Sequence, residues 1–106
     1  MKNLMNLFED AAWENADGYP KGTLQKVLRN DDFGKTILLK LPKNFFMEPH
    51  SHISTEQHII LDGEYLSGEK KFKKGCYQIF KPGDEHGPFE SKNGALIIVI
   101  WDVLKK

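Results

Sequence analysis

Short apolar segments, each ended by turn-forming residues, run through most of this chain. From residue 21 onward they occupy residues 21–29, 35–41, 58–61, 64–66, 70–73, 76–80 and 95–101. Glycine, proline, asparagine and aspartate fill the gaps between them, and the pair Asp62-Gly63 is expected to close a hairpin. Strands at this spacing predict an all-β sandwich or barrel rather than an α/β fold.

A chain of 106 residues supports one hydrophobic core and no second domain. We therefore expect a single barrel domain over residues 13–106, preceded by an arm or short helix over residues 1–12. Leu4, Leu7 and Phe8 stand at roughly helical spacing, but the segment is short, and an extended arm fits it almost as well.

The composition excludes several classes of protein. The 15 lysine and arginine residues balance the 15 aspartate and glutamate residues, so no net positive charge points to nucleic acid or anionic lipid. No apolar run reaches the roughly 18 residues of a membrane-spanning helix. The N-terminal segment is too short and polar for a signal peptide, so we expect a cytoplasmic protein. The one cysteine, Cys76, allows neither an intrachain disulfide nor a site built from thiolates alone.

The last apolar segment, residues 95–101, lacks the alternation of a strand that has one face in water. Something must therefore cover its second face. Two coverings are open from the sequence, which are the N-terminal arm and a second copy of the chain. The second would make the protein a homodimer, and we carry the homodimer forward as a prediction.

Three of the four histidines and one glutamate gather within nine residues of sequence. His50 and His52 point to the same face of a strand, about 6.6 Å apart, so both imidazoles can reach one ion. Glu56 lies too far along a straight strand, so residues 53–55 must bend and return it on a neighbouring strand. A turn before His86 could deliver that side chain from a third strand. Three imidazoles and one carboxylate suit Fe, Mn, Ni, Co, Cu or Zn, and the spacing does not choose among them.

The frame around these residues resembles the two motifs of the cupin family. In the first motif, His50-Ser51-His52 is followed by three residues, Glu56, six residues and Gly63. In the second, Gly75 is followed by five residues, then Lys81-Pro82-Gly83, two residues and His86. Lys81 stands where the family usually has proline, which changes the turn and not a ligand.

The resemblance implies a jelly-roll β-barrel with the metal ligands His50, His52, Glu56 and His86. A closer likeness, from about residue 13 to residue 101, is to the ChrR-like group of cupins. That group includes the C-terminal half of an anti-sigma factor and acetylacetone-cleaving dioxygenases. The anti-sigma role is not expected here, because in that protein it resides in a separate N-terminal domain.

The function that this resemblance implies is that of a metal-dependent, dioxygenase-like oxidoreductase. An octahedral ion with four protein ligands keeps two positions, which suit a small organic substrate with two adjacent oxygens, such as a diketone or hydroxy-ketone. The choice of dioxygen comes from the resemblance alone. Two alternatives stay open, namely a non-catalytic metal or metabolite sensor, and a hydrolase or isomerase that uses metal-bound water with His58 or Glu48 as its base.

Further side chains are candidates for the surroundings of the ion. His58 lies one pleat from Glu56 on the same face of the strand. It is a candidate base, fifth ligand, supporting group or core residue, and a supporting or core position is favoured over ligation. An apolar pocket above the ion could be lined by Phe46, Ile60, Tyr77, Ile79 and Phe89, although a place in the core is favoured for most such side chains in a small barrel.

Overall fold

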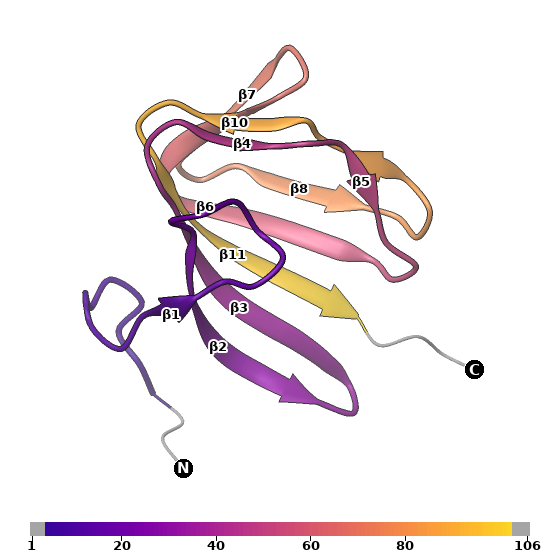
Figure 1. The fold of residues 1–106 in the computed structure, drawn as a ribbon. Helices are drawn as coiled ribbons and strands as arrows, with labels where there is room; N and C mark the ends of the chain where they lie inside the picture. The colour runs from indigo at the N-terminus through magenta and orange to yellow at the C-terminus, as the bar shows by residue number, and fades with distance from the viewer. Residues whose placement is uncertain (1–3, 103–106) are drawn as a thin grey trace.

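A computed structural model describes residues 4–102, and over these residues the chain forms strands and no helix. The strands are β1 (Glu14–Asn15), β2 (Leu24–Asp31), β3 (Gly34–Leu41), β4 (Phe45–Met47), β5 (His50–Ser51), β6 (Glu56–Ser67), β7 (Lys70–Lys73), β8 (Tyr77–Phe80), β9 (Glu85–His86), β10 (Phe89–Ser91) and β11 (Ala95–Asp102). Every strand pair is antiparallel. The predicted all-β fold is confirmed (Figure 1).

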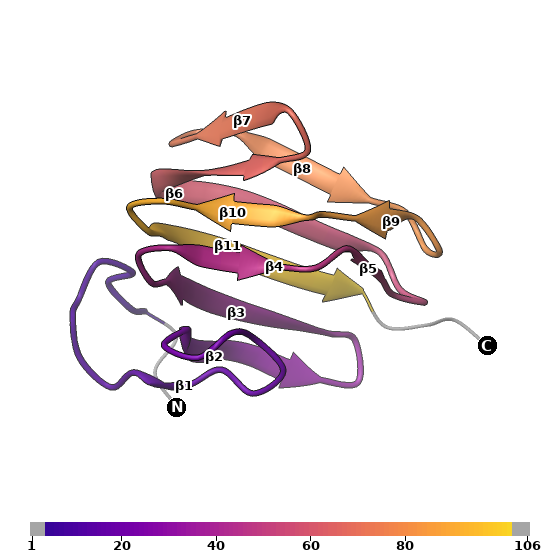
Figure 2. The ribbon, with the colours of Figure 1, turned by 45° about the horizontal axis from the view of Figure 1, so that its top comes forward.

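The main sheet has the strand order β1-β2-β3-β11-β6-β10-β4, with β7 and β8 also paired to β6, while β5 and β9 form a separate short ribbon. The sheet curls, so β4 and β10 lie in front of the layer that contains β3 and β11 (Figure 2). Alternate residues of the strands point into the space between the layers, where Ile37, Leu39, Phe45, Ile60 and Val99 are almost fully buried. This interior is the hydrophobic core of a jelly-roll β-barrel. No helix in the described part of the chain is long and apolar enough to cross a membrane.

The expected hairpin at Asp62-Gly63 is wrong, because β6 continues through this pair to Ser67. Its first half pairs with β11 and β8, and its second half pairs with β7 and β10. The change of layer comes near a shift in the β6–β11 register, where Leu61 is the extra residue on β6, two positions before Gly63. Such an extra residue bends a strand. Gly63 has a φ of 73° and lies so close to β11 that a Cβ atom would come within 2.5 Å of the Gly94 carbonyl oxygen. The pair therefore marks a bend and not a chain reversal.

The N-terminal segment is an arm and not a helix over its described residues. Asp10 of the arm pairs with Lys40 at 3.4 Å. Trp13, which directly follows the arm, places its ring under the ammonium groups of Lys26 and Lys40, at 4.7 and 5.5 Å. The arm thus packs against the outer surface of β2 and β3. It also lines a cleft with Leu96 at one end of β11, so it reaches part of the second apolar face of that strand.

Candidate metal centre

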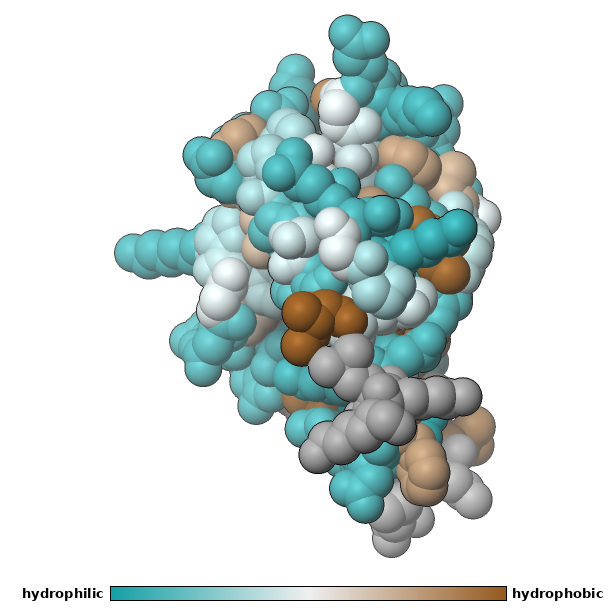
Figure 3. Space-filling view, turned by 90° about the vertical axis from the view of Figure 1, so that its right-hand side faces the viewer, coloured by the Kyte–Doolittle hydropathy of each residue, from teal (hydrophilic) through white to brown (hydrophobic). Residues whose placement is uncertain are grey.

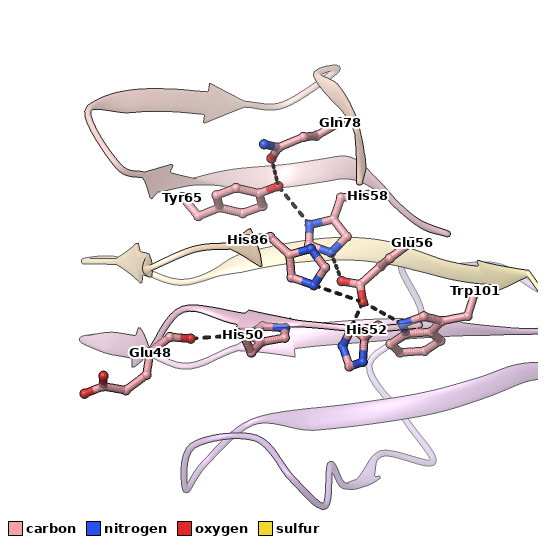
Figure 4. Close-up of polar contacts among 9 residues, drawn as sticks. All are labelled: Glu48, His50, His52, Glu56, His58, Tyr65, Gln78, His86 and Trp101. Atoms are coloured by element: carbon pink, nitrogen blue, oxygen red, sulfur yellow. Dashed lines mark hydrogen bonds and ion pairs between the residues drawn. The ribbon is translucent and has the colours of Figure 1, made fainter. Parts of the chain in front are cut away.

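Four side chains from neighbouring parts of the fold meet at one end of the barrel. His50 lies on β5, His52 follows that strand, Glu56 begins β6 and His86 ends β9. One potential ligand atom from each of these residues lies within 4.8 Å of all the others. The structure therefore brings together the four residues that the sequence motifs singled out (Figure 4).

Local chain geometry explains this convergence. The bend predicted at residues 53–55 is present, and it turns Glu56 back onto β6. His86 is the direct cross-strand partner of His50 in the β5–β9 ribbon. The turn before β9 is closed by a hydrogen bond from the Asp84 amide to the Lys81 carbonyl, and the Gly83 amide donates to the His52 carbonyl. Backbone hydrogen bonds thus fix the relative positions of the imidazoles.

One ring nitrogen of His50 has a hydrogen-bond partner, which determines where the ring proton lies. Its Nδ1 lies 3.2 Å from the Glu48 backbone carbonyl oxygen, which can only accept a hydrogen bond. The proton therefore sits on Nδ1, and Nε2 keeps a lone pair for a ligand. This arrangement is common for metal-binding histidines, whose orientation is set by a hydrogen bond at the other ring nitrogen.

His86 is the most deeply buried imidazole of the group. Its residue is 2% exposed, and neither of its ring nitrogens has a hydrogen-bond partner among the described residues. Burial lowers the pKa of His86 to about 4, against the opposing attraction of Glu56. A buried polar atom without a partner is costly, and coordination of a cation by the neutral ring would satisfy it. His86 thus fits the donor set of a transition-metal site.

Burial of His86 leads to a pH dependence of stability in the metal-free protein. Because its pKa is near 6.5 in the unfolded chain and about 4 in the folded one, only the unfolded chain takes up a proton between these values. The free energy of unfolding should therefore fall as the pH drops through this window, by about 2 to 3 kcal/mol at pH 4.5. Urea denaturation at pH 7 and pH 4.5 measures the loss. His86→Gln, which does not titrate, should show a smaller loss, and an equal loss would contradict the account.

Glu56 is held by hydrogen-bond donors on both of its oxygens. Trp101 Nε1 donates to Oε1 at 2.6 Å, and His58 Nε2 lies 2.6 Å from Oε2. Oε1 is also the oxygen nearest His52 Nε2, at 3.1 Å, and His86 Nε2, at 3.8 Å. Burial by itself would raise the pKa of the Glu56 carboxyl. The interactions with His58, Trp101 and His86 lower it by more, so the pKa lies below its usual value. The carboxylate is thus kept charged and oriented, with Oε1 toward the imidazoles.

His58 contacts the second carboxylate oxygen of Glu56, Oε2, and not the Oε1 atom that lies nearest to His52 and His86 (Figure 4). Its Nδ1 is 2.9 Å from the Tyr65 hydroxyl oxygen, which also lies 2.8 Å from Gln78 Oε1. His58 is therefore buried between Glu56 and Tyr65, and its role as a supporting or core residue stays a prediction. Glu48 points its carboxylate away from the cluster (Figure 4), so only its backbone contributes to the arrangement.

Sequence reasoning missed Tyr65 and Trp101 as neighbours of the site. The contact between Trp101 and Glu56 follows from the β6–β11 register, in which these two residues are direct partners. They are 45 positions apart in the sequence, and no spacing motif links them. A tryptophan at the end of an apolar strand signals only core packing.

Of the five side chains considered as lining for an apolar pocket above the ion, only Phe89 borders the small cavity beside His50 and Glu56. Phe46, Tyr77 and Ile79 are about half exposed, whereas Ile60 and Phe89 are buried in the core. The cavity inside the barrel beside His50 and Glu56 has a volume of only about 20 Å³, which is room for about one water molecule. Large side chains fill the interior, so it holds no organic substrate in this conformation.

The available space lies outside the core, at the mouth of the barrel. A cleft of about 390 Å³ is lined by His50, His52, Trp101, Tyr19 and Lys35, among others. This volume falls in the usual range for small-molecule sites. The surface at this end of the molecule is mainly hydrophilic, with apolar residues in small patches (Figure 3). The candidate ligands therefore border a site that solutes can reach.

The fold and the four clustered residues agree with a comparison of the sequence with known families. The profile of the ChrR cupin-like domain matches residues 2–103, nearly the whole chain. The chain belongs to the ChrR cupin-like family. A ChrR cupin-like domain with this cluster of histidines and glutamate has a possible metal site, and the metal that it would take is not defined. No curated protein matches the chain.

Solved structures share the fold of this ChrR cupin-like domain. A chain of the Rhodobacter sphaeroides SigE complex with the anti-sigma ChrR is 23% identical with a TM-score of 0.74, covering 90% of this chain and 51% of its own. The polyketide cyclase RemF of Streptomyces resistomycificus is 17% identical with a TM-score of 0.81, covering 98% and 80%. A provisionally assigned dioxygenase of Nostoc punctiforme PCC 73102 is 22% identical with a TM-score of 0.80, covering 87% and 33%. The present chain spans about half of the Rhodobacter chain. At these identities the likeness establishes the fold.

Proposed function

We propose that the protein is a metal-dependent, dioxygenase-like enzyme that acts on a small chelating organic molecule of the diketone or hydroxy-ketone type. The observation that carries this proposal is the buried, unpartnered imidazole of His86 beside the oriented carboxylate of Glu56. His50, His52, Glu56 and His86 would hold a divalent transition metal, drawn from Fe, Mn, Ni, Co, Cu or Zn. When bound, the metal supplies Lewis acidity that favours the enolate of a chelating ketone.

The surrounding residues have separate parts in this proposal. His58 and Trp101 hold Glu56 in place through one hydrogen bond to each oxygen. The filled core keeps water away from His86, which is 2% exposed. His52, with 41% of its side chain exposed, borders the cleft from which a substrate would approach. An open cleft beside the ligands supports an enzyme over a sensor with an enclosed ion.

A hydrolase or isomerase that uses a protein base is less well supported. His58 is buried behind Glu56 and contacts Tyr65, so it does not line the cleft. Glu48 directs its carboxylate away from the cluster (Figure 4). Neither candidate base faces the place where a substrate would lie. The likeness to a dioxygenase of Nostoc, provisional in its assignment, supports oxygen chemistry over these alternatives.

Oxygen consumption tests the proposed function. The protein loaded anaerobically with one equivalent of Fe(II) is mixed with a panel of 1,3-diketones and hydroxy-ketones in an oxygen electrode. We expect dioxygen uptake in proportion to substrate loss with at least one class, and no uptake with Glu56→Gln. Glu48→Gln is the matched control and should keep the activity. A fully Fe(II)-loaded protein that consumes no oxygen with any of these compounds would refute the dioxygenase.

We also propose that the protein is a homodimer formed through the outer face of β11, β6 and β8, in which β6 lies between the other two strands. Ile98 and Ile100 on β11 are only partly buried, and Tyr77 and Ile79 on the neighbouring outer surface are 53% and 51% exposed. The arm lies at the other end of this sheet, beside Leu96. Light scattering should give twice the monomer mass, and Ile98→Lys should halve it. A monomeric parent at micromolar concentration would contradict the dimer.

The domain boundaries and the cellular location are also proposals. Residues 13–106 would form the barrel domain and residues 1–12 its arm. A cytoplasmic location is compatible with the unpaired thiol of Cys76, since cytosolic proteins keep cysteines reduced.

A further inference from the structure

The cleft beside the candidate metal centre is not uniformly polar. Its inner wall carries His50 and His52, which would present a metal, and Trp101, whose indole N–H contacts Glu56. The same cleft is bordered by the side chain of Lys35. A solute of small organic size can therefore contact the ligand cluster and an ammonium group at the same time.

The position of Lys35 is fixed by the sheet. It is the direct cross-strand partner of Trp101 in the β3–β11 pair, and its ammonium lies 5.7 Å from the centre of the Trp101 ring. Trp101 in turn donates its hydrogen bond to Glu56 Oε1. Trp101 thus contacts both groups, the ammonium of Lys35 through its ring and the carboxylate of Glu56 through its indole N–H.

Lys35 forms no ion pair with any residue in the range 4–102. By contrast, Lys40 on the same strand pairs with Asp10, and Lys71 pairs with Glu64. The ring of Trp101 offers only a weak attraction at a partly exposed site. Lys35 is half-buried, so its charge is less screened by solvent than that of a fully exposed lysine. The Lys35 ammonium could therefore form an ion pair with an anion bound in the cleft.

The other formal charge in the cleft is Asp17. It is exposed on the turn before Tyr19 and lies at the solvent side, where screening weakens its influence. Lys35 and Asp17 are too far apart to form an ion pair. The half-buried Lys35 is therefore expected to have a stronger influence than Asp17 on an anion bound in the cleft.

We propose that Lys35 selects a substrate that carries an anionic group, such as a carboxylate, in addition to its two chelating oxygens. The chelating oxygens would lie at the His50 and His52 end of the cleft, and the carboxylate would lie at Lys35. This inference rests on the proposed function, because it assumes that a metal occupies the cluster. It narrows the proposed substrate class from diketones and hydroxy-ketones in general to those that also carry an acidic group.

Binding to the Co(II)-loaded protein tests this inference without turnover. The probes are 4,6-dioxoheptanoate, a 1,3-diketone with a carboxylate tail, and its methyl ester, which has the same chelating head and no charge. Each is titrated while the visible absorption of Co(II) is followed. We expect the acid to bind about tenfold more tightly than the ester, as one partly desolvated ion pair permits.

Variants of two lysines separate charge recognition from general effects. Lys35→Met should abolish the preference for the acid and leave the affinity for the ester unchanged, and Lys35→Arg should keep part of the preference. Lys40→Met, on the same strand but facing the arm, should behave like the parent. Equal affinities of the parent for acid and ester, or a preference that survives in Lys35→Met, would overturn the inference.

The same titration distinguishes a failure of this inference from a failure of the proposed function. If the protein binds no Co(II), or if neither diketone changes its absorption, the proposed function fails and the inference fails with it. If Co(II) binds and both diketones bind equally well, the proposed function stands and only the role of Lys35 is refuted.

Discussion

Replacing His86 with alanine is expected to lower the affinity for Co(II), Ni(II) or Zn(II) by more than about 100-fold. Loss of a group that merely supports a ligand already costs roughly 10- to 100-fold in metal affinity, and His86 would be a ligand itself. The metal should also lose its stabilising effect. At about 100 times its dissociation constant, a bound metal raises the free energy of unfolding of the parent by about 2.7 kcal/mol, whereas His86→Ala should gain almost nothing.

Competition with a chromophoric chelator measures the affinity, and urea denaturation with and without metal measures the stabilisation. Glu48→Gln is the control, since Glu48 precedes the cluster by two residues and its carboxylate points away (Figure 4). It should bind metal like the parent. An affinity of His86→Ala within a few-fold of the parent would remove His86 from the ligand set, whatever the oxygen-uptake experiment shows.

Gly63→Ala should lower the free energy of unfolding by about 3 kcal/mol or more. A Cβ atom at this position would meet the Gly94 carbonyl oxygen at 2.5 Å and the Ala95 Cα at 2.9 Å. Both neighbours are backbone atoms, so relief requires a shift of β6 against β11. The φ of 73° adds a conformational cost for any residue with a side chain. A backbone clash combined with strain is among the few causes of so large an effect.

Gly68→Ala provides a matched control for that substitution. Gly68 also has a positive φ, of 64°, but a Cβ atom there meets no other atom within 4 Å. Its substitution should cost only about 1 kcal/mol, from the backbone conformation alone. Urea denaturation of the metal-free proteins compares the two. Equal losses of unfolding free energy in the two variants would show that the close approach of β6 and β11 adds nothing to the cost of Gly63→Ala.

Local patterns were sufficient to predict the all-β fold, whereas the full set of four candidate ligands came from the resemblance to the cupin motifs. The spacing of His50 and His52 places both side chains on one face of a strand, and Pro82 and Gly83 predict the turn before His86. Such signals work because they depend on a few neighbouring residues. They fail at Gly63, where the same turn-forming pair serves a bend in a continuous strand.

Contacts set by strand register could not be predicted in this way. Trp101 meets both Glu56 and Lys35 because β11 lies between β6 and β3, and a single sequence does not specify that order. The filling of the interior could not be predicted either, since the sequence does not indicate whether an apolar residue such as Phe89 lines a cavity or fills it. The cleft at the barrel mouth, and the charge beside it, emerged only from the tertiary structure.

Anomalous X-ray diffraction from crystals of the Co(II)-loaded protein tests the central claim most directly. The account predicts one strong cobalt peak about 2.1 Å from nitrogen atoms of His50, His52 and His86 and in contact with Glu56 Oε1. A cobalt peak elsewhere, or a peak that lacks His86 from its ligands, would contradict the account.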